Sequence, residues 1–396
     1  MDFDDVVIGS GMSALGAVLG LDPKRRVLVL GGNPRGEYSY YDSRQTVPCA
    51  FSGVGGLGND WHGVIPTGLR ENFGACAHSD FADTFGSFYP HTDVRPRLGE
   101  PWLFVPWRAI RPAQKLAEIA LAREGRLVFL PQAAVGFCQK GRGVEVSTSD
   151  SVFRSRRAWL AAGALHTPAL LERSLGVKLG RGFVSDHALC YVGQVEGAPP
   201  LKIKRSRDGM FVPAEYGRNG IGLYTRRPAR FEFKNLDSGI EQRAVFGLPT
   251  GNAVKKILRR MSPGLLAEAF YNRFGVFAAA RTYSVYSQVL VRDAYVLADG
   301  KAPLSARAET IRAATDSARE NQPFQGLTAS RRPDMYIPGI HLHHSLDLDL
   351  LANAGINVPD AAIQVVDASV LTDIGPDHHT FKLLLAAMAR TRRTSQ

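Results

Sequence analysis

The stretch DVVIGSGMSALGAVLGL, residues 5–21, decides the fold of this chain. It begins with an apolar run that is typical of a buried strand and continues through a glycine-rich turn into an apolar helix. A second short apolar run follows at 25–32, so the sequence predicts a strand, a helix and a second strand parallel to the first. Gly9, Gly11 and Ala14 have the G-x-G-x-x-A spacing that brings a helix N-terminus to a pyrophosphate. We therefore expect a Rossmann-like, dinucleotide-binding domain.

The second strand of such a unit normally ends in an acidic residue that accepts hydrogen bonds from the ribose of the dinucleotide. Here Gly31 stands in the place of that acid. The sequence therefore predicts a weakened ribose site, in which the dinucleotide is held loosely or another residue supplies the contact. A small-residue turn followed by Thr167-Pro168 predicts a second place where the backbone passes close to the cofactor before a helix begins.

Composition and charge describe an ordinary globular protein that is unusually basic. The 396 residues are 45% hydrophobic and 21% charged, and no run of about 18 apolar residues would span a membrane. The net charge of +11 is spread along the chain without an RNP, helix-turn-helix or zinc-finger pattern, so we expect no nucleic-acid partner. No secretory signal pattern is present and the four cysteines have no C-x-x-C spacing, which predicts a cytoplasmic protein without disulfides.

Changes in composition and in hydrophobic pattern along the sequence predict two domains. Residues 1–190 and 336–396 combine the dinucleotide motif with apolar strands, and we expect them to form one discontinuous α/β domain. Residues 191–335 mix strand-like runs with helices and many arginines, which predicts a smaller, sheet-containing α+β domain for substrate binding. Within it, the basic amphipathic segment 253–277 is either a surface helix packed on the core, a dock for an anionic substrate, or a peripheral membrane contact. Periodicity and turn residues predict helices at 111–125, 167–176 and 380–393.

Five segments in this order resemble the glucose–methanol–choline (GMC) oxidoreductases, a family of enzymes that bind FAD. They are the N-terminal dinucleotide motif, GVGGLGNDWHG (53–63), GALHTPALLERS (163–174), LGRGFVSDHA (179–188) and VVDASVLTDIGPDHHTFKLLLAAMA (365–389). The match covers nearly half of the chain and leaves the middle without a counterpart. The resemblance implies the GMC-type fold, and because this chain is shorter than is usual for the family, its substrate domain or lid is expected to be trimmed.

The resemblance also implies a catalytic pair of residues at the flavin. His378 follows Asp367 at the position of the family's catalytic His or Asn, and His341 opens the segment GIHLHHSLDL (339–348), where the other catalytic histidine is expected. Oxidation of an alcohol removes a hydride from carbon and a proton from oxygen, so we expect His341 to take the proton and His378 to hold the alkoxide, or the reverse. The alternates that neighbour this pair in the sequence are His343, His344 and His379.

Two other interpretations of these histidines stay open at the level of sequence. The runs HLHH and HH are compatible with a metal site because imidazole is a common ligand, but no acidic residue completes a convincing set and we expect no metal. The histidines are also compatible with a surface position and no role.

The residues that hold FAD follow from the same resemblance, and we expect the cofactor to be noncovalent. Asp60 stands where some relatives attach the flavin through a histidine, and His62 comes two residues too late for that attachment. The expected cofactor contacts are Gly9, Gly11, Ser13, Ala14, Gly31, Gly55, Gly56, Asn59, Asp60, Val135, Ala162, Gly163, Asp367, His378, His379 and Thr380.

The main functional hypothesis is an FAD-dependent oxidoreductase that converts an alcohol or sugar hydroxyl into a carbonyl, with oxygen, a quinone or another molecule as electron acceptor. A trimmed lid favours a large substrate, such as a glycan, a lipid-linked sugar or a biosynthetic intermediate. Two alternatives are a GMC-fold lyase whose FAD is structural, and a non-enzymatic protein that binds anionic partners through its positive charge.

Overall fold

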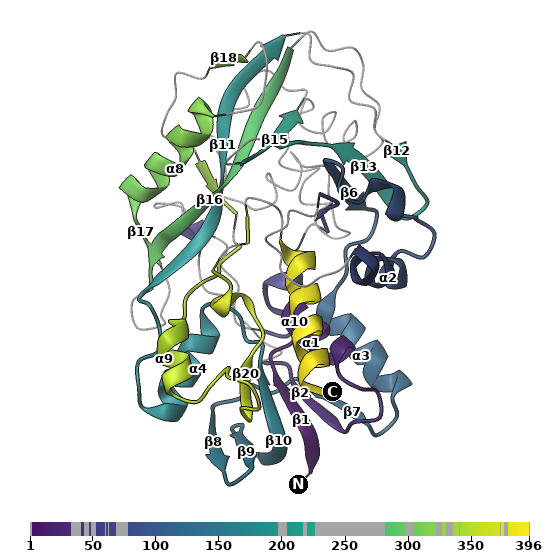
Figure 1. The fold of residues 1–396 in the computed structure, drawn as a ribbon, viewed down its shortest axis with the longest axis vertical. Helices are drawn as coiled ribbons and strands as arrows, with labels where there is room; N and C mark the ends of the chain where they lie inside the picture. Colours follow the sequence, from purple (N-terminus) through teal and green to yellow (C-terminus); the bar gives the residue numbers. More distant parts are fainter. Residues whose placement is uncertain are drawn as a thin grey trace.

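A computed structural model describes most of the chain in two parts, one above the other in Figure 1. The described residues are 2–32, 41–42, 47–48, 53–59, 61, 63–68, 78–196, 204–216, 220–225, 282–297, 304–321, 327–329, 336–339, 341–372, 374–375 and 379–395. The segment 253–277, together with Asp60, His62 and His378, lies outside these residues.

The lower part of the molecule is built on a mostly parallel sheet with the strand order β7-β2-β1-β10 (Figure 1). Its parallel strands are β1 (Phe3–Ile8), β2 (Val27–Leu30), β7 (Leu127–Leu130), β10 (Val152–Leu160) and β20 (Ile363–Val365). β20 pairs with the second half of β10, and β9 (Gly143–Ser147) pairs antiparallel with the first half and with β8 (Gly136–Lys140). The carboxyl ends of the parallel strands therefore meet at one edge, where α/β sheets bind their ligands.

Helices cover both faces of this sheet, as a parallel sheet requires. The helices are α1 (Met12–Gly20), α3 (Pro112–Ala122) and α10 (Thr380–Ser395) on one face, and α4 (His166–Leu175) and α9 (Leu348–Asn353) on the other. Successive side chains of β1 explain the two cores: Val7 packs with Leu384 of α10, whereas Ile8 packs with Leu170 of α4. The helices predicted at 111–125, 167–176 and 380–393 are thus α3, α4 and α10.

The first and last helices of the chain lie side by side against the sheet (Figure 1). Gly16 and Gly20 of α1 face α10, and a Cβ atom at either position would overlap the carbonyl oxygen of Leu384 or Met388. The hydroxyl of Thr391 also contacts the Ala17 carbonyl oxygen at 3.2 Å. Only glycine permits this approach, so the sequence at the start of the chain is fitted to the sequence near its end.

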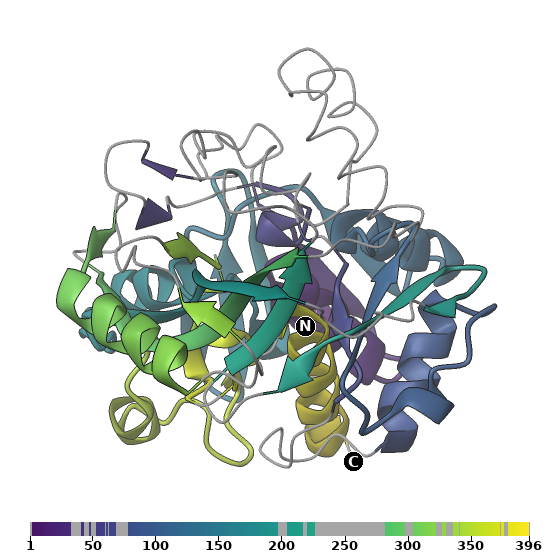
Figure 2. The same cartoon turned by 90° about the horizontal axis from the view of Figure 1, so that it is seen from above.

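The upper part of the molecule is built on an antiparallel sheet whose two long strands, β11 (Phe183–Glu196) and β16 (Thr282–Val296), pair along their whole length. Its other strands are β14 (Glu215–Tyr216), β15 (Gly220–Thr225), β17 (Ser305–Ala306), β18 (Leu327–Ala329) and β19 (Tyr336–Pro338). α8 (Ala308–Glu320) covers one face, where Cys190 and Val289 share a core with Ile311, and Figure 2 shows α8 to one side of the strands. Because side chains alternate along a strand, His187 and Leu189 lie on the opposite face.

Smaller elements connect the two parts. The remaining elements are α2 (His78–Phe88), the sheet β12 (Lys204–Arg205), β13 (Gly209–Pro213), β6 (Trp102–Pro106) and β5 (Ile65–Pro66), and the pair β3 (Tyr41–Asp42) and β4 (Val47–Pro48). The expected boundary at 190/191 falls inside β11, and the one at 335/336 falls at the start of β19, which pairs with β11. The division into two domains stays a prediction.

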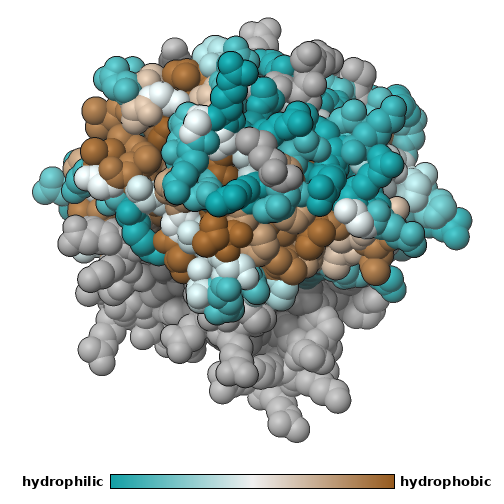
Figure 3. Space-filling view, turned by 90° about the horizontal axis from the view of Figure 1, so that it is seen from below, coloured by the Kyte–Doolittle hydropathy of each residue, from teal (hydrophilic) through white to brown (hydrophobic). Residues whose placement is uncertain are grey.

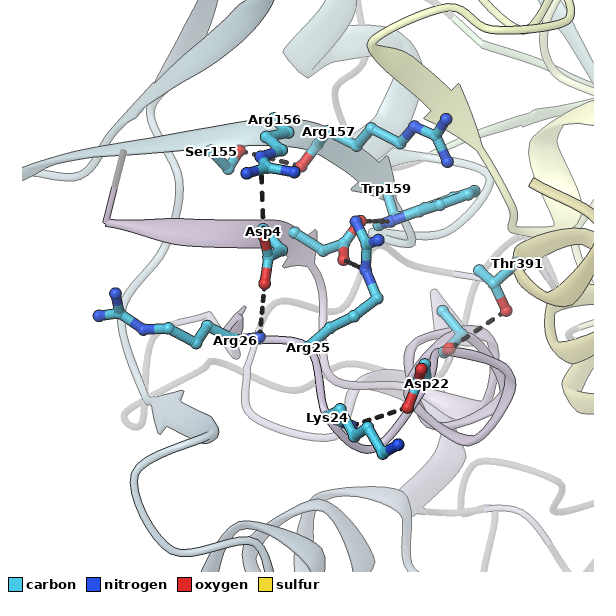
Figure 4. Close-up of polar contacts among 12 residues, drawn as sticks. Asp4, Asp22, Lys24, Arg25, Arg26, Ser155, Arg156, Arg157, Trp159 and Thr391 are labelled. Atoms are coloured by element: carbon cyan, nitrogen blue, oxygen red, sulfur yellow. Dashed lines mark hydrogen bonds and ion pairs between the residues drawn. The ribbon is translucent and has the colours of Figure 1, made fainter. Parts of the chain in front are cut away.

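A buried ion pair ties β1 to the segment before β2 and to β10 (Figure 4). The carboxylate of Asp5 is fully buried; one oxygen accepts a hydrogen bond from Trp159 Nε1 at 2.9 Å, and the other pairs with Arg25 Nε. Asp4, next to it and partly exposed, accepts the backbone N–H of Arg26 at 2.9 Å. We call Asp5, Arg25 and Trp159 the Asp5 cluster.

The surface of the lower part mixes hydrophilic and hydrophobic side chains when the molecule is seen from below (Figure 3). Exposed apolar residues of the described chain include Leu121 of α3, Val152 of β10 and Val177 in the loop after α4. None of the described helices is both long enough and apolar enough to cross a membrane.

Candidate active site

The turn between β1 and α1 has the shape that the sequence predicts for a dinucleotide site. Gly9 has a φ of +128°, and a Cβ atom there would overlap the carbonyl oxygen of Ala161. α1 begins directly after Gly11, with Ser13 and Ala14 buried in its first turn, with no side chain capping its N-terminus and with no acidic residue in that turn. The first backbone N–H groups of a helix have no partner within the helix, so this uncapped terminus fits a pyrophosphate.

A glycine-rich loop, residues 53–59, lies on this turn. The hydroxyl of Ser10 donates to the Gly31 carbonyl oxygen at 2.5 Å and accepts the Gly55 N–H at 2.7 Å. Gly55 and Gly56 have φ values of +88° and +53°, and a Cβ atom at Gly11 would meet only the Gly55 oxygen, at 3.8 Å. Ser10 therefore joins Gly31 to Gly55 beside the turn that contains Gly9 and Gly11. The space beside Gly9, Gly31 and Gly55 is filled by protein atoms, whereas Gly11 and Gly56 have room beside them.

Asn59 and Val135, two other expected cofactor contacts, use their polar groups within the protein. Asn59 Nδ2 donates to the Val54 carbonyl oxygen at 2.6 Å. The N–H of Val135 donates to Ser147 O at 2.7 Å, and its carbonyl accepts from Arg173 at 3.1 Å. These residues shape the loops on either side of the sheet edge.

Asp367, another expected contact, uses its buried carboxylate to join two segments. One oxygen accepts the Gly163 N–H at 2.8 Å and the Thr167 hydroxyl at 2.5 Å. The other oxygen accepts the N–H of Ser369 at 3.0 Å and its hydroxyl at 2.5 Å. The carboxylate thus fixes the turn that contains Ala162 and Gly163 beside the end of β20, so a cofactor contact at Asp367 would fall to its backbone.

The segment that carries His341, His343 and His344 is hydrogen-bonded to the residues that follow β10 and β20. His344 N–H donates to Ala368 O at 2.9 Å, and Ser345 N–H donates to Ser369 O at 3.0 Å. The Ser345 hydroxyl donates to Ala164 O at 2.5 Å. The histidines that the sequence marks as candidates therefore sit next to the carboxyl ends of β10 and β20.

Four histidine rings meet here, and we call His187, His341, His343 and His379 the histidine cluster. The centroid of the His379 ring lies 4.8 Å from that of His341, 4.9 Å from that of His187 and 5.7 Å from that of His343. The centroids of His187 and His341 are 5.3 Å apart. His187 comes from β11, His341 and His343 from the loop after β19, and His379 directly precedes α10.

Burial keeps three rings of this cluster neutral, those of His187, His343 and His379. Burial, aided by the neighbouring His343, lowers the pKa of His187 to about 3, and burial lowers the pKa of His343 to about 4. Burial and then the nearby His341, His187 and His343 hold the pKa of His379 well below its usual value. At neutral pH these imidazoles carry no charge and each keeps a nitrogen that can accept a proton.

Several ring nitrogens of the cluster have no hydrogen-bond partner. Within the described part of the chain, these are the buried Nδ1 atoms of His187 and His379 and Nε2 of His343. The opposite nitrogens of two rings are engaged, because His187 Nε2 lies 2.7 Å from Gly375 O and His343 Nδ1 lies 2.9 Å from His341 O. Buried polar atoms without a partner are rare and costly, which is typical of a reactive site.

Asp186 holds two of the histidines in place through their backbones. Its buried carboxylate Oδ1 accepts the N–H groups of His187 and His341, both at 2.7 Å. Tyr295 donates its hydroxyl to Oδ2 at 3.4 Å. β11 and the His341 segment therefore share one anchor, which fixes the spacing of the two rings.

His344, one of the alternates, lies outside the cluster. Its Nδ1 is 2.9 Å from Arg181, which pairs with Asp293 at 2.8 Å, and its φ is +53°. Burial and the charge of Arg181 lower the pKa of His344. Of the three alternates, His343 and His379 join His341 and His344 does not.

Sequence reasoning gave His187 no role, although its Asp186-His187 segment contributed to the resemblance. Its neighbours in the sheet supply the other wall of the site: the register pairs His187 with Leu290 and Leu189 with Gln288 on the face away from α8. No arrangement of three or more His, Cys, Asp or Glu residues that could hold a metal ion occurs among the residues described.

Comparison with known proteins supports the fold. The sequence matches no protein-family model and no curated protein. The structure is similar to that of pyridoxine 4-oxidase from Mesorbium loti, with a TM-score of 0.54 and 16% identity over 99% of each chain. This match confirms the GMC-type α/β fold expected from the sequence.

Two further structures resemble the chain less closely. A new fungal aryl-alcohol oxidase gives a TM-score of 0.48 at 14% identity, covering 99% of this chain and 98% of the other. An FAD-dependent oxidoreductase from Chaetomium thermophilum gives 0.47 at 13% identity, with the same coverage.

Proposed function

We propose that this protein is an FAD-dependent oxidoreductase that converts an alcohol hydroxyl into a carbonyl. The observation that carries the proposal is the histidine cluster, which gathers buried neutral imidazoles at the ligand-binding edge of a dinucleotide fold. The likeness in fold to pyridoxine 4-oxidase, whose name describes the oxidation of pyridoxine, supports the same reaction class.

The residues present fit FAD. The uncapped N-terminus of α1 and the turn through Gly9 and Gly11 would hold the pyrophosphate, and the glycine-rich loop would lie along the rest of the cofactor. FAD, when bound, supplies the acceptor for the hydride that leaves the alcohol carbon. We propose noncovalent binding, so acid denaturation is expected to release the yellow cofactor from the protein.

His341 is proposed to take the proton of the alcohol hydroxyl. An imidazole nitrogen is a suitable proton acceptor, and the Asp186 carboxylate fixes the backbone N–H groups of His341 and its neighbour His187 at 2.7 Å each. The other rings are close enough that a second positive charge would be repelled, so the cluster holds one proton at a time. His378 is proposed to hold the developing alkoxide, as the sequence resemblance implies.

The substrate is proposed to lie against the face of the second sheet that carries His187. Leu189, Tyr286 and Gln288 are buried on or beside this face, which combines apolar surface, an aromatic ring and an amide. Such a wall suits a ring that bears hydroxyl groups, in line with a sugar or other large alcohol. Oxygen is the proposed electron acceptor.

The visible absorption spectrum of the purified protein is the first test. Flavin bands are expected, and anaerobic addition of the right alcohol from a panel of pyridoxine, aryl alcohols, glycans, glucose and methanol should remove them. Brisk turnover of free glucose or methanol would contradict a large substrate, and turnover without any loss of the bands would favour the lyase. A protein that neither contains nor takes up FAD, and whose only ligands are anions bound in a salt-sensitive way, would refute the proposal.

A further inference from the structure

The end of β2 has no space for the acid that normally binds the ribose of a dinucleotide. A Cβ atom at Gly31 would lie 2.5 Å from Phe129 Cε2, 3.0 Å from Cζ of the same ring and 3.4 Å from Leu130 O. A side chain at Gly31 would overlap the Phe129 ring unless the ring moved, so packing from β7 favours glycine at this position. The segments 26–32 and 126–135, which form the ends of these two strands, contain no Asp or Glu.

Gln132 lies next to Gly31, the position where the acid is missing. It follows β7, and its carbonyl oxygen accepts the N–H of Gly32 at 3.0 Å, while the N–H of Gly31 donates to Leu130 O at 2.7 Å. The chain after β7 therefore runs directly alongside the chain after β2 at the carboxyl edge of the sheet. This is the place where a ribose lies in dinucleotide-binding folds.

The side chain of Gln132 carries an unused acceptor. The residue as a whole is partly exposed, but its Oε1 atom is shielded from solvent and has no hydrogen-bond partner in the described part of the chain. A shielded carbonyl oxygen without a donor is unfavourable, because it has lost its hydrogen bonds to water and gained none. A ligand hydroxyl would remove this cost.

We propose that the Gln132 amide replaces the missing acid and binds a ribose hydroxyl in the adenosine half of FAD. The inference rests on the proposed function, because it requires that FAD binds. Like a carboxylate oxygen, the amide oxygen accepts a hydrogen bond, and the amide nitrogen keeps two donors for a neighbouring oxygen or ring nitrogen. Because the amide is neutral, its bond to the ribose is weaker than that of a carboxylate, which gives the loosely held cofactor that Gly31 predicts.

The test measures FAD binding to apoprotein by the quenching of flavin fluorescence, together with the melting temperature of each apoprotein. Gln132→Leu removes the amide at similar size, and Gln132→Met is a second apolar variant in case the first folds poorly. Gln139→Leu is the matched control, because Gln139 is exposed on β8 of the same sheet.

The expected result is an FAD dissociation constant about ten-fold higher for both Gln132 variants, the loss of one hydrogen bond, with no change for Gln139→Leu. The apoprotein should melt at an unchanged or higher temperature, because an unpaired buried acceptor has been removed. An FAD affinity within two-fold of wild type, or weaker binding together with a lower apoprotein melting temperature, would overturn the role of Gln132 and leave the proposed function standing. Wild-type protein that does not bind FAD would overturn the proposed function itself.

Discussion

Two of the buried polar clusters among the described residues meet opposite requirements. In the Asp5 cluster the carboxylate of Asp5 meets both a guanidinium and an indole N–H, so each buried oxygen has a donor. In the histidine cluster, the described Nδ1 atoms of His187 and His379 have none. A satisfied cluster holds strands together, whereas an unsatisfied cluster costs stability and keeps atoms available for chemistry. The comparison predicts that changes in one cluster alter folding and changes in the other alter turnover.

The largest effect is expected from His341→Ala. Removing the proposed base should lower kcat/KM by about 10²–10⁴-fold. The flavin content and the melting temperature should stay close to those of wild type, because the backbone bond from His341 to Asp186 survives the substitution. Steady-state kinetics with the best alcohol of the panel gives the ratio. Full activity in this variant would show that another histidine of the cluster is the base.

The next effect is expected from Arg25→Met, which leaves the Asp5 carboxylate buried and unpaired. Loss of one partner of a buried ion pair costs about 3–5 kcal/mol, and the partial exposure of Arg25 places the expected loss at or below the lower end. Urea unfolding measures this free energy. kcat per bound flavin should not change. A selective loss of kcat with wild-type stability would show that the Asp5 cluster serves turnover rather than folding.

A smaller effect is expected on the pH dependence of folding stability, in which the histidine cluster should differ from the Asp5 cluster. The pKa values of His187 and His343 in the folded protein, about 3 and about 4, lie below the unfolded value of about 6.5. The unfolded chain therefore binds more protons, so stability is complete above pH 6.5 and is lost as the pH falls toward 4, by up to about 1.4 kcal/mol per pH unit for each ring.

Melting temperatures between pH 7.5 and 4.5 measure this loss. His343→Gln should make the profile shallower, because one titrating ring is gone. Arg25→Met should lower the whole profile above pH 6.5 without changing its shape there. Identical profiles for His343→Gln and wild type would show that the cluster is not neutral in the folded state.

The smallest effect is expected from His344→Gln. Its ring contacts Arg181 and lies outside the cluster, so kcat/KM should change by less than about three-fold, the scale of one lost surface contact. This variant is the matched control for His341→Ala, since both come from the same loop. A loss comparable to that of His341→Ala would extend the reactive group of histidines beyond the cluster.

The parts of the fold that depend on local patterns could be predicted from the sequence. Gly9, Gly11 and Ala14 predict the turn and the packing of α1, and periodicity predicts α3, α4 and α10. The family resemblance paired His341 with His378 and left His379 as an alternate; the rings of His341 and His379 are 4.8 Å apart.

What could not be predicted depends on contacts between distant parts of the chain. His187 reaches the cluster because Asp186 binds the backbone of His341, a contact that no local pattern records. Gly31 looked like a missing acid, but the ring of Phe129 on the neighbouring strand favours a glycine there. The position of His378 and its role stay predictions.

The close packing of α1 and α10 joins two segments that are synthesised far apart in time. A ribosome adds about 5–20 residues per second, so α1 emerges tens of seconds before the helix that covers Gly16 and Gly20. β20 also joins the sheet long after its partner β10 has been synthesised. A nascent chain that already contains the whole dinucleotide motif therefore exposes the apolar side of α1 to water and to chaperones. A premature stop before α10 would remove no residue of that motif and would still prevent the domain from closing.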